Sequence, residues 1–417
     1  IGVRMLFRAS CALRIPVGLK RCALVRCMSD LVQSHAGVVQ GGTVVVDAPS
    51  AGGRVRIQTV WEESVTSIVS PTGETSSSDL AFEEDAAGSL LCIAAQPGAS
   101  RIPDLTLQVP QYIDVHVRLA SGTVEQTGKI EGGLSVELED GDISADKVRG
   151  PRLRLRTNRG SVDIRSLFEG DSDIKGTTVR AKRLMGNSVS VQAMQSADVG
   201  AVYGASTVVR VDGGETSIDA DGQTKALSIG TLHGSLKAHV NAPGDISIQG
   251  ITGNVQLQAP HSERSALHFD EIHGAASEVV TSGDIAVSFS PPVRVQLSGD
   301  AAKLDVQPSA VAHWSREGDN EGTHFSGLLA AEATDRSASR GSGKISRAAG
   351  EGMYQATATA FFSSPGDAAG RERALRVAAG ESVAPAPQQP PAALRMHTQG
   401  SASVSIVGWA DSVLARL

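Results

Sequence analysis

Three arginines alternate with leucines in the segment PRLRLR, at Arg152, Arg154 and Arg156. Neighbouring side chains of a strand point to opposite faces, so these arginines would form one outward basic row. Such a row could bind an anionic partner, or it could pair with acids of a neighbouring strand, for which Glu137 and Glu139 are the candidates. We favour ion pairing, and we keep the three arginines as the candidate interaction surface.

A second set of polar residues directly follows turn glycines. The tripeptide G-D-I occurs at Gly141, Gly244 and Gly283. Clustered aspartates could serve a polysaccharide-cleaving enzyme, but such enzymes usually also offer aromatic platforms, and aromatics are almost missing from residues 132–287. An aspartate at a turn can instead bond the turn backbone, and we favour that role. The aspartates concerned are Asp142, Asp245 and Asp284, with Asp173 close to another turn glycine.

Metal and cofactor chemistry has little support in the sequence. There is no C-x-x-C, no H-E-x-x-H and no EF-hand loop. The acids of DGGETSIDADG (212–222) could bind calcium, but their spacing matches no calcium-binding repeat. The histidines within the repeats are expected at the surface or in turns; they are His233, His239, His261, His268 and His273. We therefore expect no metal site, no cofactor and no catalytic residues.

Nucleophile and phosphate-loop motifs are also missing. The run RGSGKIS (340–346) is similar to a phosphate loop, but Ala338 stands where a glycine is required and Ile345 replaces the hydroxyl residue. No G-x-S-x-G motif is present. Cys92 lies in the apolar run LLCIAA with no supporting base nearby, so we expect a buried strand residue there.

The elements that must position these residues are short strands. From Gly132 to about Val287 apolar and polar residues alternate in runs such as LSVEL (134–138) and ISI (246–248). This period of two predicts strands with one inward face. Glycines interrupt the series in steps of about nine or ten residues, and glycine alone adopts corners of positive φ without a steric penalty.

Two such steps would close one coil of about twenty residues, a period that predicts a β-solenoid. A sandwich of hairpins is the alternative, but it would more often show large aromatic core residues, and aromatics are only 3% of this chain. We predict an all-β chain that forms a single β-solenoid, like a right-handed parallel β-helix. The residues expected to face inward are Leu134, Val136, Leu138, Leu153, Leu155, Val162, Ile164, Ile246, Ile248, Val255, Leu257, Ile285 and Val287.

The chain is expected to divide into five segments. Residues 1–29 would be a targeting presequence, 30–120 an irregular β region that caps the solenoid, and 121–307 the solenoid repeats. Residues 308–397 would be a disordered, low-complexity insertion with one possible strand pair, because they contain DRSASRGSGK and APAPQQPPAA. In residues 398–417 the alternating run SASVSIVGW predicts a strand that returns to the solenoid, followed by a short tail.

The leader differs from the rest of the chain in charge. Residues 1–28 contain six basic residues and no acid, so a formal net charge of −7 for the whole chain leaves −13 on residues 29–417. A basic, acid-free leader with interleaved apolar residues is typical of a mitochondrial presequence, and it lacks the unbroken apolar stretch of a secretory signal. We expect a soluble mitochondrial protein with an acidic body that does not bind nucleic acid. No run of about 18 apolar residues predicts a membrane-spanning helix.

The repeat motifs resemble those of the "putative adhesin" domain family, in particular its little-studied eukaryotic branch with mitochondrial-type leaders. The motifs that carry the resemblance are GDISADKVRG, GSVDI, GGETSIDADG, GDISIQGITGNVQLQ and SGDIAVSF, with LTLQVPQYIDVHVRL before them and GSASVSIVGW after them. The resemblance implies a glycine- and aspartate-punctuated β-solenoid, and it supplies no catalytic residues. The long insertion at 308–395 departs from the family's layout.

These observations favour an interaction or structural scaffold over an enzyme. A solenoid exposes long faces whose outward residues are free to vary, which suits protein binding without catalytic apparatus. We expect protein partners, and the sequence does not identify them. A carbohydrate-active β-helix enzyme and an anion- or metal-dependent binding module are the alternatives.

Overall fold

The computed structural model describes residues 31–35, 41–72, 75–76, 79–84, 89–213, 225–273, 277–291, 293–306, 311–319, 322–331 and 392–407. These residues form strands joined by short turns, with no α-helix among them. The strands of the first half are β1 (Leu31–His35), β2 (Thr43–Val60), β3 (Val65–Ser70), β4 (Leu80–Glu84), β5 (Leu90–Ala95), β6 (Asp104–Pro110), β7 (Asp114–Thr127), β8 (Lys129–Ile130), β9 (Leu134–Arg159) and β10 (Ser161–Val211). Those of the second half are β11 (Lys225–Val240), β12 (Gly244–Ala259), β13 (Ser262–Ile272), β14 (Ser277–Thr281), β15 (Asp284–Phe289), β16 (Val293–Ala301), β17 (Lys303–Val306), β18 (Val311–Asp319), β19 (Gly322–Ala331), β20 (Ala392–Thr398) and β21 (Ser401–Ile406).

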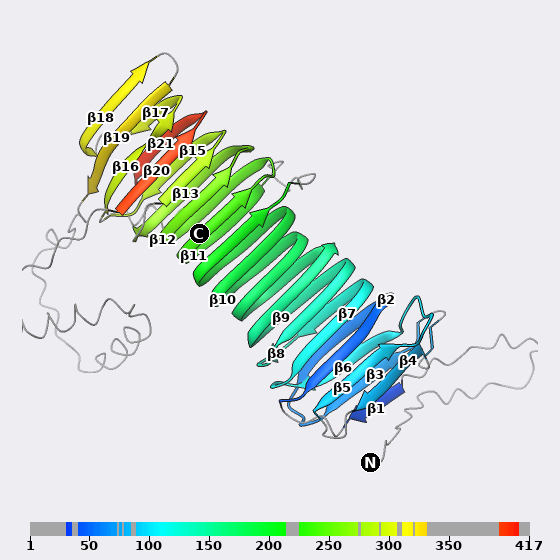
Figure 1. Cartoon of the computed structure of the whole chain (residues 1–417). Coiled ribbons are helices and arrows are strands. Elements are labelled where there is room, and N and C mark those ends of the chain that lie inside the picture. Colours follow the sequence, from blue (N-terminus) through cyan, green and yellow to red (C-terminus); the bar gives the residue numbers. More distant parts are fainter. Residues whose placement is uncertain are drawn as a thin grey trace, which may run out of the picture. The chain divides into compact units, whose positions relative to one another are not determined.

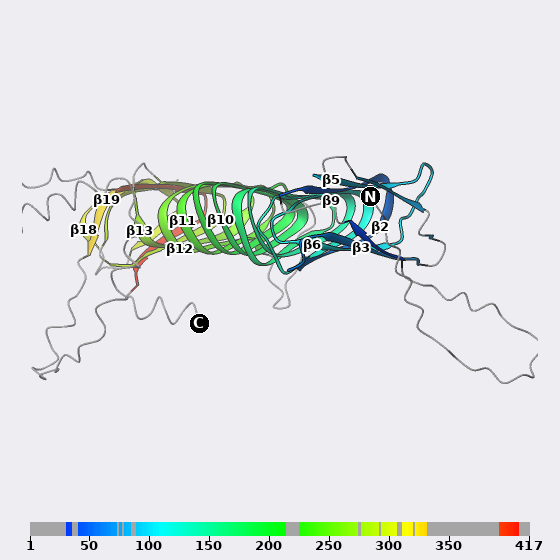
Figure 2. The same ribbon diagram turned by 90° about the horizontal axis from the view of Figure 1, so that it is seen from below.

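The body is a stack of parallel coils. Strands β7, β9, β10, β11 and β12 pair side by side in this order, all in parallel (Figure 1). Paired residues in successive coils are 19 positions apart at Val117↔Val136, and the same step recurs at Ile229↔Ile248. The long strands β9 and β10 continue through corners into the next coil, and Figure 2 shows the chain circling in this way. Parallel pairing at this period confirms the solenoid and rejects the sandwich of hairpins.

Alternate side chains of each strand fill the interior. All thirteen residues predicted to face inward are at most 4% exposed. The core is mostly valine, leucine, isoleucine and alanine, with Phe168, Phe269 and Phe289 as its largest members. Fully burying one such aliphatic side chain contributes about 1.5–3 kcal/mol, so the stack is stabilised along its whole length.

Glycines form a ladder at one corner of the coils. Gly122, Gly141 and Gly160 have φ values of 124°, 127° and 146°, in the region that favours glycine. A Cβ at Gly141 would lie 1.8 Å from the carbonyl oxygen of Gly122 in the coil before, and one at Gly160 would lie 2.0 Å from that of Gly141. The corner therefore excludes side chains both by conformation and by the close approach of successive coils.

Antiparallel strands cover the N-terminal end of the stack. β2 pairs in parallel with β5 and β6 on one side and with β7 on the other. Antiparallel β4 lies against β5, β3 lies against β6, and β1 lies against β3. An unpaired parallel edge would invite association with other chains, and these strands occupy it. Within the region 30–120, β2, β5, β6 and the start of β7 pair in parallel, and β1, β3 and β4 pair antiparallel.

The C-terminal end departs from chain order. β20 pairs in parallel with β14 on one side and with β16 on the other, and β21 lies likewise between β15 and β17 (Figure 1). Residues 392–407 thus supply a coil inside the stack. The C-terminal chain thus lies in the stack as two strands, and the first begins at Ala392 rather than at the expected bound of 398.

A hairpin closes this end. β18 and β19 pair antiparallel, and β19 pairs antiparallel with β16. The sequence allows one strand pair within residues 308–397, and β18 and β19 form a strand pair there. The predicted presequence 1–29, the run RGSGKIS (340–346) and the tail after residue 407 lie outside the described residues.

Candidate functional site

The outer face of β2, β7, β9 and β10 carries rows of alternating charge. Asp47, Arg118 and Glu137 occupy one row in register across β2, β7 and β9. On the neighbouring coils Arg154 is in register with Asp173, and Arg156 with Lys175. Because parallel coils place equivalent residues next to one another, a charge on one coil directly faces the side chain above it.

Two of the three candidate arginines form ion pairs on this face. Arg154 lies 3.0 Å from Glu137 on one side and 3.8 Å from Asp173 on the other. Arg156 pairs with Asp173 as well. The predicted pairing with Glu137 is thus confirmed for Arg154, whereas Asp173, which had been assigned to a turn, replaces Glu139 as the second acidic partner.

Arg152 differs from the other two arginines. Its side chain is exposed, and it forms no ion pair with any of the described residues. Lys175, which the sequence did not single out, donates to the side-chain oxygen of Asn158 at 3.2 Å rather than to an acid. Arg152 and Lys175 are therefore two cations of this face that form no ion pair within the part of the chain that the structure describes.

The charged face is hollowed. A depression of about 350 Å³ is lined by Arg118, Arg154, Arg156, Lys175, Glu137 and Glu139, with Pro49, Leu119, Leu138 and Asn158 between them. The side chains of Arg154 and Glu137 are 45% and 39% exposed, so their attraction is screened by water and is worth about 0.2–1 kcal/mol. Pairs this weak can exchange their partners for charges on an incoming surface.

Two of the aspartates that follow turn glycines, Asp142 and Asp284, have a different role from the predicted one. Asp142 accepts hydrogen bonds from the backbone N–H of Ser161, at 2.8 Å, and from its hydroxyl, at 2.7 Å. Asp284 accepts the same two bonds from Ser401 at the same distances. These hydrogen bonds hold the pKa of Asp284 below its usual range. Each of these carboxylates therefore accepts hydrogen bonds from a serine of the next coil, and not from the backbone of its own turn.

A second polar group lies at the C-terminal end of the stack. His268 Nδ1 is 2.7 Å from Ser288 Oγ, and His268 Nε2 is 3.1 Å from Ser290 Oγ and 3.4 Å from Asp270. The imidazole is only 13% exposed. The prediction that His268 lies at the surface or in a turn is therefore wrong, because His268 is part of β13 and its side chain links β13 to β15.

A hollow of about 320 Å³ adjoins His268, with Ser247, Gln249, Ser403 and Ser405 among its lining residues. Serine, histidine and an acid in line can activate a hydroxyl group. The same trio occurs at the N-terminal cap, where His35 lies 2.6 Å from Glu84 and 2.9 Å from Ser67. Ser67 is fully buried there, so no substrate can reach it. The trio at His35 joins β1, β3 and β4, whereas His268 and Ser288 lie beside a hollow.

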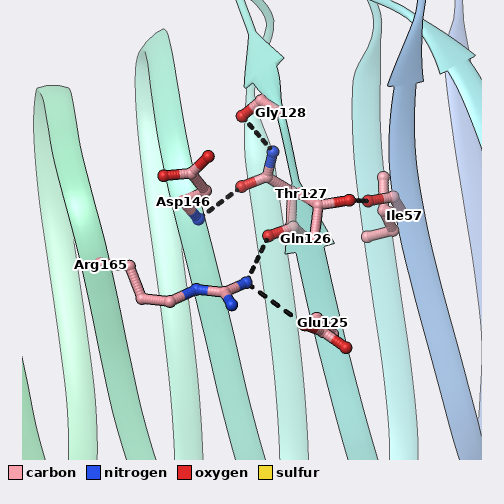
Figure 3. Close-up of polar contacts among 7 residues, drawn as sticks. All are labelled: Ile57, Glu125, Gln126, Thr127, Gly128, Asp146 and Arg165. Carbon is pink, nitrogen blue, oxygen red and sulfur yellow. Dashed lines mark hydrogen bonds and ion pairs between the residues drawn. The ribbon is translucent and has the colours of Figure 1, made fainter.

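Gln126 is a buried amide that joins neighbouring coils (Figure 3). Its amide nitrogen donates to the carbonyl of Gly128, and its side-chain oxygen accepts from the N–H of Asp146, both at 2.9 Å. Arg165, one coil further, donates to the backbone oxygen of Gln126 and to Glu125. Both polar side-chain atoms of Gln126 therefore have a hydrogen-bond partner within the stack, and the amide links the coils of β7 and β9.

Cys92 lies on β5, as predicted, but it is half-buried because Leu91 and Ile93 take the inward positions. Burial, with help from Asp47 and Glu83, raises the pKa of its thiol. A raised pKa keeps the thiol protonated at neutral pH, so it is a poor nucleophile.

Among the described residues no group of three or more metal-ligating side chains comes together. Of the predicted calcium candidates only Asp212 falls within them, and it contacts Gln192 at 2.7 Å and pairs with Arg210. Glu215, Asp219 and Asp221 lie outside the described residues. In the same part of the chain no helix is long and apolar enough to cross a membrane.

No family model matches this chain, and no curated protein matches its sequence. Two solved structures align along most of its length. One is titled a "putative cell adhesion protein" from Clostridium sporogenes, with 7% identity, a TM-score of 0.16, and coverage of 91% of this chain and 98% of the other. The second is titled a "putative adhesin" from Bacteroides fragilis, with 6% identity, a TM-score of 0.24, and coverage of 91% and 97%. Neither superposition is close enough to carry an argument about this chain.

Proposed function

We propose that this chain is a non-enzymatic scaffold whose charged face binds a protein partner. The observation that supports the proposal is the depression of about 350 Å³ on β7, β9 and β10, where exposed cations and acids alternate. A partner whose surface carries acids opposite these cations, and cations opposite these acids, could replace each weak internal ion pair with a pair across the interface. Lys175 in the depression and Arg152 on the same strand as Arg154 form no ion pair with any residue that the structure describes, so acidic side chains on the partner would gain most.

Such a surface determines orientation and encounter rate more than affinity. Complementary charges steer association and penalise wrong partners, and their effect falls as salt rises. We therefore expect complexes that weaken between low and physiological ionic strength.

Proximity labelling from residues 30–417 tests the proposal. The variant Arg152→Glu, Arg154→Glu, Arg156→Glu should lose most of the proteins labelled by the wild-type chain. A matched control is Arg180→Glu, Lys182→Glu, Arg183→Glu, which changes the charge equally at exposed positions of β10 away from the depression. Because new glutamates would face Glu137 and Asp173, the neutral variant with glutamine at 152, 154 and 156 separates lost binding from lost stability.

Equal loss of labelled proteins in both charge-reversal variants would contradict the proposed surface. Turnover of a glycan by the purified chain, abolished by Asp142→Asn and Asp284→Asn, would instead favour the enzyme.

We also propose that residues 1–29 direct the chain into mitochondria. The support is their six basic residues and the absence of any acid. A fluorescent reporter fused to residues 1–40 should accumulate in mitochondria. Diffuse cytosolic fluorescence would overturn this part of the proposal and leave the charged face untouched.

A further inference from the structure

His268 connects two serines and an acid in one chain of hydrogen bonds at the C-terminal end of the stack. The hydroxyl of Ser290 donates to Asp270 at 3.2 Å. The Ser290 oxygen is thus left to accept from His268 Nε2, at 3.1 Å, and Asp270 lies 3.4 Å from the same nitrogen. Both acceptors favour the tautomer with the proton on Nε2, which leaves the lone pair of Nδ1 to accept from Ser288 Oγ at 2.7 Å. A serine that donates to a histidine oriented by a third group is the arrangement of an activated nucleophile.

Ser288 borders the hollow of about 320 Å³ that adjoins His268. Its hydroxyl oxygen lies 3.5 Å from the carbonyl oxygen of Leu267, much farther than from Nδ1 of His268, so the histidine is its acceptor. The described lining of the hollow contains serines, alanines, Gln249 and aliphatic residues, but no acid, lysine or arginine. The space next to Ser288 therefore suits a short, uncharged group.

The trio at the N-terminal cap has the same chemical groups without the access. His35 lies 2.6 Å from Glu84 and 2.9 Å from Ser67, contacts as close as those of His268. Ser67 is fully buried, whereas Ser288 is partly exposed and lines a hollow. A small reagent can therefore reach Ser288 and not Ser67, so the chain carries its own comparison between an accessible and an enclosed serine.

We propose that Ser288 is a nucleophile that is acylated by short, uncharged carboxylic esters in this hollow. Ser288 Oγ forms a bond to the carbonyl carbon of the ester while its proton moves to His268 Nδ1. The bond between that carbon and the alcohol oxygen then breaks, and the leaving oxygen takes the proton from His268. An alcohol departs, and Ser288 keeps the acyl group as an ester.

Ser405 lies beside this reaction. It is in register with Ser288 across β15 and β21 and lines the same hollow. Its hydroxyl can donate to the carbonyl oxygen as negative charge develops there, which lowers the barrier. One acylation per chain requires no turnover, so the proposal adds a reactive group to the scaffold and does not depend on the charged face.

Incubation of the full-length chain with p-nitrophenyl acetate tests the proposal. We expect a first phase that releases one equivalent of p-nitrophenolate per chain, and peptide mapping by mass spectrometry that finds the acetyl group on Ser288. Ser67 should stay unmodified, because it is enclosed. An unmodified Ser288, or acetyl groups spread equally over Ser288 and the other serines of the hollow, would overturn the proposal whatever the variants do.

The variant His268→Gln tests the base. It should slow acetylation of Ser288 by about 100-fold or more, because no group is left to take the proton. The matched control is Ser403→Ala, which removes a serine from the lining of the same hollow and should leave the rate unchanged. Equal rates in the wild type and in His268→Gln would contradict an activated Ser288.

Asp270 acts as a positioning residue, and its variants keep the test decisive if His268→Gln does not fold. Asp270 is partly exposed, so substitutions there are expected to be tolerated. Asp270→Asn should slow the acetylation of Ser288, because the carboxylate that stabilises the imidazolium is lost, and Asp270→Glu should restore part of the rate. An unchanged rate in Asp270→Asn would show that Asp270 does not orient His268 and would overturn the proposed chain of hydrogen bonds.

Discussion

Two junctions of the stack use the same hydrogen bonds but join very different parts of the chain. Asp142 bonds the N–H and hydroxyl of Ser161, 19 residues further on. Asp284 bonds the N–H and hydroxyl of Ser401, 117 residues further on. A segment can thus form a coil of this stack wherever it lies in the chain. It needs alternating apolar residues and, at the corner, a serine that donates to the aspartate of the coil before.

The difference between the two junctions lies in loop closure. The Asp142 junction closes within one coil, whereas the Asp284 junction can form only after a far longer loop has closed, at an entropic cost that rises with loop length. Local contacts therefore favour early formation of the middle of the stack, and the C-terminal coil is expected to join last and to open first.

Removing the C-terminal coil should give the largest effect. A chain that ends at residue 391 loses the burial of Leu394, Met396, Ala402 and Val404, on the order of 5 kcal/mol or more. Hydrogen exchange should then show lost protection in β14–β19, with β9–β11 unchanged. A chain that ends at Val407 keeps both strands and serves as the control; equal protection in the two truncated chains would contradict the inserted coil.

The glycine corner should give the next largest effect. Gly141→Ala combines a φ of 127° with a Cβ placed 1.8 Å from a carbonyl oxygen, so we expect a loss of about 3 kcal/mol or more in the free energy of unfolding. Gly41→Ala has a φ of 87° but open space around the Cβ and should cost only about 1–2 kcal/mol. Denaturant unfolding compares the two, and equal costs would mean that successive coils are not in close contact at this corner.

Removing either Asp142 or Asp284 should have a moderate effect. Asp142→Ala and Asp284→Ala each delete a charged acceptor of two hydrogen bonds, which is worth about 1–2 kcal/mol near the surface. Exchange of amide hydrogens should increase around Ser161 in the first variant and across β20 and β21 in the second. If both variants instead exchanged their amide hydrogens through global unfolding, with the same residues affected, the Asp284 junction would not be weaker than the Asp142 junction.

Acid should produce the smallest effect. The pKa of Asp284 is lowered in the folded chain by the bonds from Ser401, so its contribution to stability is complete above the usual aspartate pKa of about 4. That contribution should disappear as the pH falls through the lowered value. The difference in melting temperature between the wild type and Asp284→Asn should therefore shrink below about pH 4; a constant difference would show that the carboxylate charge is not involved.

The sequence predicted the regular part of this molecule well, because period and burial coincide there. Leu134, Val136 and Leu138 are buried, as the alternation of apolar and polar residues in their strand predicts. The corner aspartates were found but assigned the wrong partner, since a bond to the next coil depends on register, which no single repeat reveals.

The C-terminal order could not be predicted in the same way. β20 and β21 have the alternating pattern of any coil, and nothing in the pattern states which neighbours they join. His268 was misplaced because alternation puts it outward, while its burial comes from Ser288 and Ser290 one coil away. The sequence pattern does not single out Lys175, because its neighbour Arg156 is 19 positions earlier in the sequence and becomes adjacent only when the coils stack.

The insertion of residues 392–407 between β15 and β17 is tested most directly by three cysteine pairs in single chains that lack the native cysteines. Ala286 with Ser403, and Ser403 with Asp305, are partners in register. Ala286 and Asp305 are separated by two strand spacings, about 9.6 Å, which is beyond the reach of a disulfide. We predict that the first two pairs close and the third stays reduced; closure between positions 286 and 305 would show that β17 stacks directly on β15 and would contradict the inserted coil.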